Sequence, residues 1–288
     1  MSIMNRLSTA DRVRVVSALV EGNSLRATAR MTGVARMTVE KLLRDLGQAC
    51  AIYHDEHVRD LTCQRIQCDE IWSFCYAKQR NVPTDKVGLF GYGDIWTWTA
   101  IDADTKLIAS YLVGDRSRRT AYGFMYDLAH RIRNRVQLTT DGHKAYLFAV
   151  DTAFEGREID YAVLDKIYVA DNPQGRYSPP KIVTSKAAVI KGNPDPRHVS
   201  TSYVERQNLT MRMSMRRFTR LTNGFSKKVS NHADNVALHF MHYNYCRVHE
   251  TLRVTPAMAA GLINHVWEIE ELVGLIDPAS STFVQVSA

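Results

Sequence analysis

The middle of the chain alternates between strand-like and helix-like patterns, and this order constrains the fold more than any other feature. "RIQCDEIWSFCYAK" (65–78) and "GDIWTWTAIDADTKLIASYLVGD" (93–115) are rich in the β-branched and aromatic residues that favour strands. "RRTAYGFMYDLAHRIRN" (118–134) spaces its apolar residues for one helix face, and "VQLTTDGHKAY" (136–146) is a short strand ending in Asp-Gly. "YAVLDKIYVA" (161–170) is a strand or a helix. The order predicts a mixed sheet flanked by helices.

The N-terminal part of the chain has the spacing of three short helices. Ser8 or Thr9, and then Ser24, stand where helix N-caps are expected, and Gly33 and Gly47 stand where the second and third helices are expected to end. Two helices joined through a glycine turn are typical of a helix-turn-helix, whose second helix fits the DNA major groove. Its outward face carries Arg36, Thr38, Lys41 and Arg44. A plain three-helix bundle with solvated charges is the alternative.

The segments around these patterns are less regular. Residues 48–63 are polar with no sustained period and predict a connector, and 171–200 is rich in Pro, Gly and Lys and predicts a loop or hairpin. Helices are expected again from about 202 to 272. Trp72 and Trp98 are expected in the core.

The composition is that of a soluble globular protein with an excess of positive charge. Of 288 residues, 45% are hydrophobic and 23% charged, and the net charge of +7 is compatible with a nucleic-acid partner. No apolar run reaches the ~18 residues that suggest a membrane span. The start "MSIMNRLSTADR" lacks the apolar core of a signal peptide. We therefore expect a cytoplasmic protein with no membrane partner.

Cysteine and histidine residues gather in "CAIYHDEHVRDLTC", which holds Cys50, His54, His57 and Cys63. Four such side chains can bind zinc, but their spacing matches no common finger and the chain has no CxxC pair. The five cysteines form no even framework, as expected for a reducing compartment. Unligated thiols and surface histidines are the favoured interpretation.

Three acidic residues occupy positions of interest for chemistry. Asp69 lies within the first strand-like segment, Asp141 at the end of a later strand, and Glu205 at the start of the helix "YVERQNLTMRM". Carboxylates from separate elements can hold two divalent cations, which clamp the oxygens of a phosphodiester. The ordinary alternatives are an edge-strand Asp, an Asp-Gly turn and a capping box between Ser202 and Glu205. Glu70 competes with Asp69, because strand neighbours face opposite ways and alternation does not decide between them.

A one-sided run of positive charge follows Glu205. From residue 205 to residue 228 the chain has seven Lys or Arg residues, including Arg220, and one acid. Arg212 lies two helical turns after Glu205, roughly on the same face, and Arg216 falls near that face. A solvated helix normally mixes its charges, so we expect this surface to bind phosphates.

Several stretches resemble a known family of DNA transposases. "DEIWSFCYAK" (69–78), "TTDGHKAY" (139–146) and "TSYVERQNLTMRMSMRRFTRLTNGFSKK" (201–228) are similar to the insertion-sequence-one type, among the DDE transposases and integrases with an RNase H-like core. Residues 25–47 are similar to that family's DNA-binding part. "VERQN" with the trailing "RLTNGFSK" is the specific part of the match. The tail "NYCRVHETLRVTPAMAAGL" (244–262) looks more like retroviral-integrase-like transposases, and the family's N-terminal zinc ribbon has no counterpart.

The resemblance implies metal-dependent DNA chemistry. Asp69 matches the Asp of the family's D-E-x-W, Asp141 the Asp of T-D-G and Glu205 the Glu of E-R-x-N, so Asp69 is preferred to Glu70. These three acids would hold two Mg²⁺ or Mn²⁺ ions, cleave DNA at the terminal inverted repeats and join the freed 3′-hydroxyl to target DNA. His143 and Lys144 either touch DNA or are exposed in a turn. The DNA-binding residues expected are Arg36, Thr38, Lys41, Arg44, His143, Lys144, Arg206, Asn208, Arg212 and Arg216.

The resemblance also implies the organisation of the chain. The expected fold is α/β, an RNase H-like mixed sheet flanked by helices, with an N-terminal all-α helix-turn-helix domain. The expected parts are a helix-turn-helix domain over 1–48, a linker over 49–63, a catalytic domain over 64–250 and a helical tail over 251–288. A homodimer or higher oligomer on double-stranded DNA is expected, in a bacterial cytoplasm at the nucleoid. The alternative function is a helix-turn-helix regulator with an inactive transposase-like core.

Overall fold

The structure is a computed structural model, and its contacts divide the chain into two compact units. The structure describes residues 7–169, 181–219 and 223–277, so Arg220 lies outside the described residues. The first unit contains residues 1–59, 72–96 and 208–288, and the second contains residues 60–71 and 97–207. No helix in the described ranges is long and apolar enough to cross a membrane.

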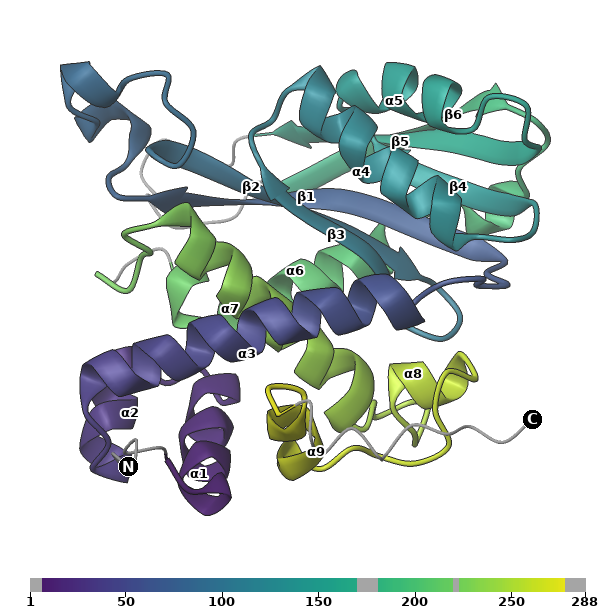
Figure 1. The fold of residues 1–288 in the computed structure, drawn as a ribbon. Coiled ribbons are helices and arrows are strands. Elements are labelled where there is room, and N and C mark those ends of the chain that lie inside the picture. The colour runs from purple at the N-terminus through teal and green to yellow at the C-terminus, as the bar shows by residue number, and fades with distance from the viewer. Residues whose placement is uncertain (1–6, 170–180, 220–222, 278–288) are drawn as a thin grey trace. The chain divides into compact units, whose positions relative to one another are not determined.

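The chain forms a six-stranded mixed sheet, most of which lies in the second unit (Figure 1). The strands are β1 (Arg65–Cys75), β2 (Gly93–Asp102), β3 (Ile108–Gly114), β4 (Val136–Asp141), β5 (Ile159–Val169) and β6 (Lys181–Lys191), in the order β3-β2-β1-β4-β5-β6. Strand β4 is parallel to β1 and β5, whereas β5 and β6 are antiparallel. Helices α4 (Arg118–Arg131) and α5 (Ala145–Ala153) pack together on one face of the sheet (Figure 1). The predicted mixed sheet flanked by helices is confirmed.

The local sequence explains these elements. Ser117 caps α4 by accepting a hydrogen bond from the Thr120 N–H at 3.3 Å, and the apolar stripe that includes Phe124 and Leu128 is fully buried, as its spacing predicts. The ambiguous segment 161–170 is a strand up to Val169, and β6 pairs with it in antiparallel orientation. Residues 170–180 lie outside the described part. Trp98 is buried as predicted, whereas Trp72 is only half-buried.

The first unit is helical for most of its length. Its helices are α1 (Thr9–Val20), α2 (Leu25–Thr32), α3 (Arg36–His57), α7 (Val229–Met241), the π-helix η5 (His242–Cys246), α8 (Pro256–Ala259) and α9 (Ile269–Gly274). The predicted caps are confirmed, because Ser8 accepts from the Asp11 N–H and Ser24 from the Ala27 N–H, both at 3.1 Å. Gly33 ends α2 in the left-handed conformation, with φ of 72°.

The prediction that the third helix ends at Gly47 is wrong. Helix α3 continues without a break to His57 and therefore takes up most of the predicted connector. Gly47 lies where α3 meets α7, side by side in Figure 1, and a Cβ there would overlap the backbone of Asp234. The glycine is needed because two helices approach closely at this position. Sequence rules that consider one helix alone interpret the same glycine as a helix end. His54, expected at the surface, is buried in α3.

Candidate active site

Asp69 and Asp141 occupy equivalent positions on two neighbouring parallel strands, one residue beyond the same pair of opposite residues. In the β1–β4 pair, Cys68 lies opposite Thr140, and the two aspartates are the next residues along. The sheet extends through β2 and β3 on one side of β1, and through β5 and β6 on the other side of β4. The strand order therefore reverses between β1 and β4, which is where open α/β sheets bind ligands, at the carboxyl ends of the strands.

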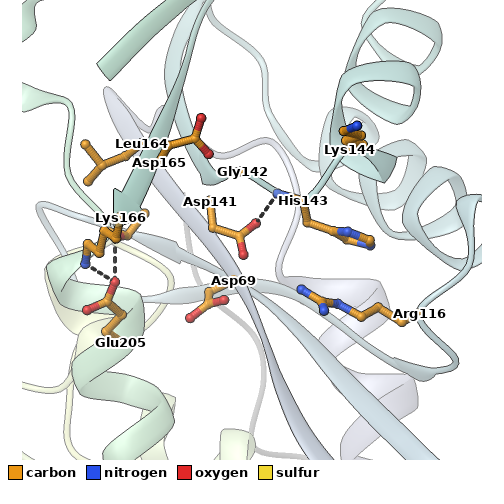
Figure 2. Close-up of a pocket in the computed structure, with 11 residues that line it drawn as sticks. Asp69, Arg116, Asp141, Gly142, His143, Lys144, Leu164, Asp165, Lys166 and Glu205 are labelled. Carbon is orange, nitrogen blue, oxygen red and sulfur yellow. Dashed lines mark hydrogen bonds and ion pairs between the residues drawn. The ribbon is translucent and has the colours of Figure 1, made fainter. Parts of the chain in front are cut away.

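A pocket of about 640 Å³ opens at this position (Figure 2). Its charged and titratable lining residues are Asp69, Arg116, Asp141, His143, Lys144, Asp165, Lys166 and Glu205. Asp69 comes from β1, Asp141 from the end of β4, and Glu205 from the first turn of α6 (Ser202–Ser214). The fold thus brings the three predicted acids, which are far apart in the sequence, to one pocket.

Burial raises the proton affinity of both aspartates. Burial, and then the nearby Asp141 and Glu70 carboxyls, raise the pKa of Asp69 to about 8. Burial also raises the pKa of Asp141, against the His143 backbone N–H, which donates to Asp141 Oδ1 at 3.0 Å. Two carboxyl groups in this state bind a cation readily, because a bound positive charge would offset both causes of the shift.

Glu70 is occupied by other partners. Arg116 Nε donates to Glu70 Oε1 at 2.7 Å, and the Tyr146 hydroxyl donates to Oε2 at 3.0 Å. Burial, and then Asp141, raise the pKa of Glu70 to about 7. Asp69 lines the pocket, and its Oδ1 accepts the Glu70 backbone N–H at 2.8 Å. Asp69 lines the pocket and Glu70 does not, and this favours Asp69 over Glu70 as the acid that a ligand in the pocket would contact.

Glu205 lines the pocket but is bound to a lysine. Its carboxylate forms an ion pair with Lys166 of β5 and accepts a 2.6 Å hydrogen bond from the Thr201 hydroxyl (Figure 2). Helix α6 begins at Ser202, and the Glu205 N–H donates to the Thr201 carbonyl. Thr201, and not Ser202, therefore stands at the cap position in front of the helix.

A tight group of possible metal ligands lies at the base of this site. Among the described residues, one group of at least three acidic, histidine or cysteine side chains has ligand atoms within 4.8 Å of one another, namely Asp69, Glu70 and Asp141. Glu205 does not belong to that group. Carboxylate oxygens suit hard divalent cations such as Mg²⁺ and Mn²⁺. The donor set of Asp69 and Asp141 therefore fits a divalent cation.

The predicted DNA-binding residues fall into several places. His143 and Lys144 line the pocket, and burial, followed by the charge of Arg116, lowers the pKa of His143. Arg206 is exposed on α6, whereas Asn208 is buried. Arg212 is half-buried. Arg216 is exposed in a 3₁₀ turn that follows the end of α6 at Ser214, so its expected place on that helix face is wrong.

The predicted recognition face lies on α3 in the first unit. Arg36, Lys41 and Arg44 are exposed and Thr38 is half-buried. Each cation has an acidic neighbour on the same helix: Arg36 pairs with Glu40 at 3.3 Å, and Lys41 and Arg44 both approach Asp45. Exposed pairs of this kind are weak, so they leave the cations able to exchange to phosphates.

Sequence reasoning missed two cations of the pocket, Arg116 and Lys166. Lys166 and its neighbour Asp165 interrupt the apolar strand β5. A charge inside a strand was the signal that singled out Asp69, so the same test could have found them. Arg116 follows β3 in "GDRSRR", where nothing local distinguishes it from the arginines after it.

No protein-family model and no curated protein matches the chain. Among solved structures, the chain is similar to the Mos1 transposase paired-end complex with left transposon end (12% identity, TM-score 0.24, covering 55% of this chain and 60% of that one). It is also similar to the Mos1 mariner paired end complex with Mn (11%, 0.23, 55% and 60%) and to the Mos1 Strand Transfer Complex (12%, 0.23, 55% and 59%). The match thus covers about 60% of the length of these transposase chains, and at such TM-scores the likeness does not establish a common fold or activity.

Proposed function

We propose that this protein is a DNA transposase of the insertion-sequence-one type, with Asp69, Asp141 and Glu205 as its catalytic carboxylates. The observation that carries the proposal is the pair of crowded aspartates at the point where the strand order reverses, in a pocket that also contains Glu205. Buried acids whose pKa values are raised are typical of functional sites.

Asp69 and Asp141 would hold two Mg²⁺ or Mn²⁺ ions, with Glu205 as a third ligand once it leaves its ion pair with Lys166. Divalent cations at such a site stabilise the charge of a phosphodiester and activate the attacking oxygen. The His143 N–H orients Asp141 for this role. The reaction is cleavage at the element's terminal inverted repeats, followed by attack of the freed 3′-hydroxyl on target DNA.

Exposed cations would recognise the DNA. The exposed cations of α3, Arg36, Lys41 and Arg44, would contact double-stranded DNA at the terminal repeats. Arg206, Lys144 and Arg216 are exposed and would contact phosphates. A homodimer or higher oligomer on DNA, at the nucleoid in the bacterial cytoplasm, completes the proposal, because transposition joins two ends.

The test is cleavage of a plasmid that carries the sequences flanking the gene, with Mg²⁺ or Mn²⁺. We expect the wild-type protein to nick the plasmid at those ends, and Asp141→Asn to bind the same DNA without nicking it. Asp69→Asn should be inactive, and an active Asp69→Asn together with an inactive Glu70→Gln would make Glu70 the catalytic acid instead. If the wild-type protein binds the ends but does not cleave them, whichever divalent metal is added, the protein is a DNA-binding regulator and not a transposase.

A further inference from the structure

Arg116 brings a positive charge to the edge of the candidate active site. It lies in the connection between β3 and α4 and lines the pocket together with Asp69 and Asp141. Figure 2 shows its guanidinium group directed toward these two carboxylates. The Arg116 side chain is 42% exposed, so a ligand in the pocket can reach it.

Glu70 fixes the position of this guanidinium group. Arg116 Nε and Nη2 lie 2.7 and 2.6 Å from the same oxygen, Glu70 Oε1. The other oxygen accepts the hydrogen bond from the Tyr146 hydroxyl. The Glu70 side chain is 0% exposed, and Tyr146, on α5, is fully buried beside Trp98. Because both oxygens have partners from different elements, Glu70 is a rigid anchor for Arg116.

Asp115, the sequence neighbour of Arg116, and Lys166, another cation of the pocket, have partners of their own. Asp115 accepts hydrogen bonds from the Ser117 hydroxyl at 2.5 Å and from the Thr120 hydroxyl. Lys166, another cation of the pocket, is paired with Glu205. A guanidinium group has five N–H donors in a planar fork that matches the oxygens of a phosphate. Arg116 therefore combines a permanent charge, an anchored edge and access to the pocket.

We infer that Arg116 binds the non-bridging oxygens of the DNA phosphate that lies beside Asp69 and Asp141, and that Glu70 is the positioning residue for Arg116. The ligand class is a phosphodiester, and the inference rests on the proposed function of the pocket. Glu70 is thereby assigned to the arginine and not to a metal ion, although its carboxylate lies in the same acidic group.

Binding to DNA without cleavage tests the phosphate contact. The probe is a short fluorescent duplex with Ca²⁺ in place of Mg²⁺, titrated at several salt concentrations. We expect Arg116→Gln to weaken binding and to reduce the slope of log affinity against log salt by about 0.9, the loss of one phosphate contact. The matched control is Arg119→Gln, which removes an exposed arginine of the same segment that does not line the pocket. An unchanged slope in Arg116→Gln, or an equal decrease in Arg119→Gln, overturns the inference.

Cleavage and metal binding test the roles of the two side chains. Arg116→Gln should reduce plasmid nicking about 100-fold, and Arg116→Lys should recover little of it, because an ammonium group cannot bind in the bidentate way. Added methylguanidinium should restore part of the activity of Arg116→Ala. Glu70→Gln should also nick slowly, but it should bind Mn²⁺ with wild-type affinity in a calorimetric titration.

Two outcomes separate this inference from the proposed function. If Glu70→Gln weakens Mn²⁺ binding as strongly as Asp141→Asn does, Glu70 is a metal ligand and its positioning role is wrong. If the wild-type protein neither binds Mn²⁺ nor nicks DNA, the proposed function fails, and the salt dependence of Arg116→Gln still decides whether this arginine contacts phosphate.

Discussion

At the scale of single residues, the candidate site is a place where negative charge is concentrated by the fold. Asp69 and Asp141 lie one residue beyond the paired Cys68 and Thr140, so the strand register itself brings them together. An uncompensated acid in such a place costs folding free energy when it ionises. Ionised acids at such a site lower the free energy of unfolding, and a bound cation can restore it.

This charge predicts an unusual dependence of stability on pH. The pKa of Asp69 in the folded protein is raised to about 8, so folding favours the protonated side chain. The stability that this preference contributes is complete below the pKa of Asp69 in the unfolded chain and is lost as the pH rises through about 8. With chelator present, the free energy of unfolding measured in urea should therefore fall between about pH 5 and about pH 9, by an amount on the order of a few kcal/mol. Asp69→Asn should flatten this fall, and an equal fall in the variant would contradict the prediction.

Metal ions should act in the opposite direction. Because the ionised pair of Asp69 and Asp141 is the form that binds a cation, Mg²⁺ should raise the melting temperature more at about pH 9 than at about pH 5. Asp141→Asn serves as the control and should show little response at either pH. If Mg²⁺ leaves the melting temperature of the wild-type protein unchanged at both pH values, the metal site is contradicted.

At the scale of elements, the sequence predicted the helices and strands that are determined by their own residues. Helix α4 has an apolar stripe and a capping serine, strand β4 is a short apolar segment that ends in Asp-Gly, and both form where expected. Gly47 is different, because its reason is the neighbouring helix α7, which no local pattern reveals. The pocket shows the same limit: Asp69, Asp141 and Glu205 stand out in the sequence, whereas Arg116 becomes notable only through its contact with Glu70.

The close approach of α3 and α7 predicts the sign of a substitution. Gly→Ala within a helix normally stabilises a protein by up to ~1 kcal/mol. At Gly47 a Cβ would overlap the Asp234 backbone, so Gly47→Ala should instead lower the free energy of unfolding by about 1–3 kcal/mol. The control is Gly274→Ala, at the end of α9, where nothing lies within 4 Å of the added carbon. Chemical denaturation of the two variants decides, and a stabilised Gly47→Ala would show that the helices do not meet here.

At the scale of the whole molecule, each compact unit is built from segments that are distant in sequence. The first unit joins the N-terminal helices to residues 208–288. Within it Arg12 of α1 forms a 2.7 Å ion pair with Asp277, and Tyr53 of α3 packs against Tyr245 and Trp267. The boundaries predicted at residues 48, 63 and 250 remain predictions, because a linear pattern does not show which distant segments share a core.

This arrangement predicts the effect of removing the N-terminal helices. A chain without residues 1–59 would expose the surface of α7 on which α3 packs, so we expect it to melt at a lower temperature and to aggregate. The full-length protein, prepared in parallel, is the reference for thermal unfolding. A truncated chain that remains monomeric with the full-length melting temperature would favour an independent N-terminal domain.

The central claim, that the pocket containing Asp69, Asp141 and Glu205 carries out transposition, is tested most directly by strand transfer. A labelled duplex that contains the terminal sequence and ends in a free 3′-hydroxyl is incubated with a supercoiled plasmid and Mg²⁺. The account predicts that the wild-type protein joins the labelled strand covalently to the plasmid, and that Asp69→Asn, Asp141→Asn and Glu205→Gln bind the duplex without joining it. A wild-type protein that binds the end but forms no joined product, or an Asp141→Asn variant that joins it, would contradict the claim.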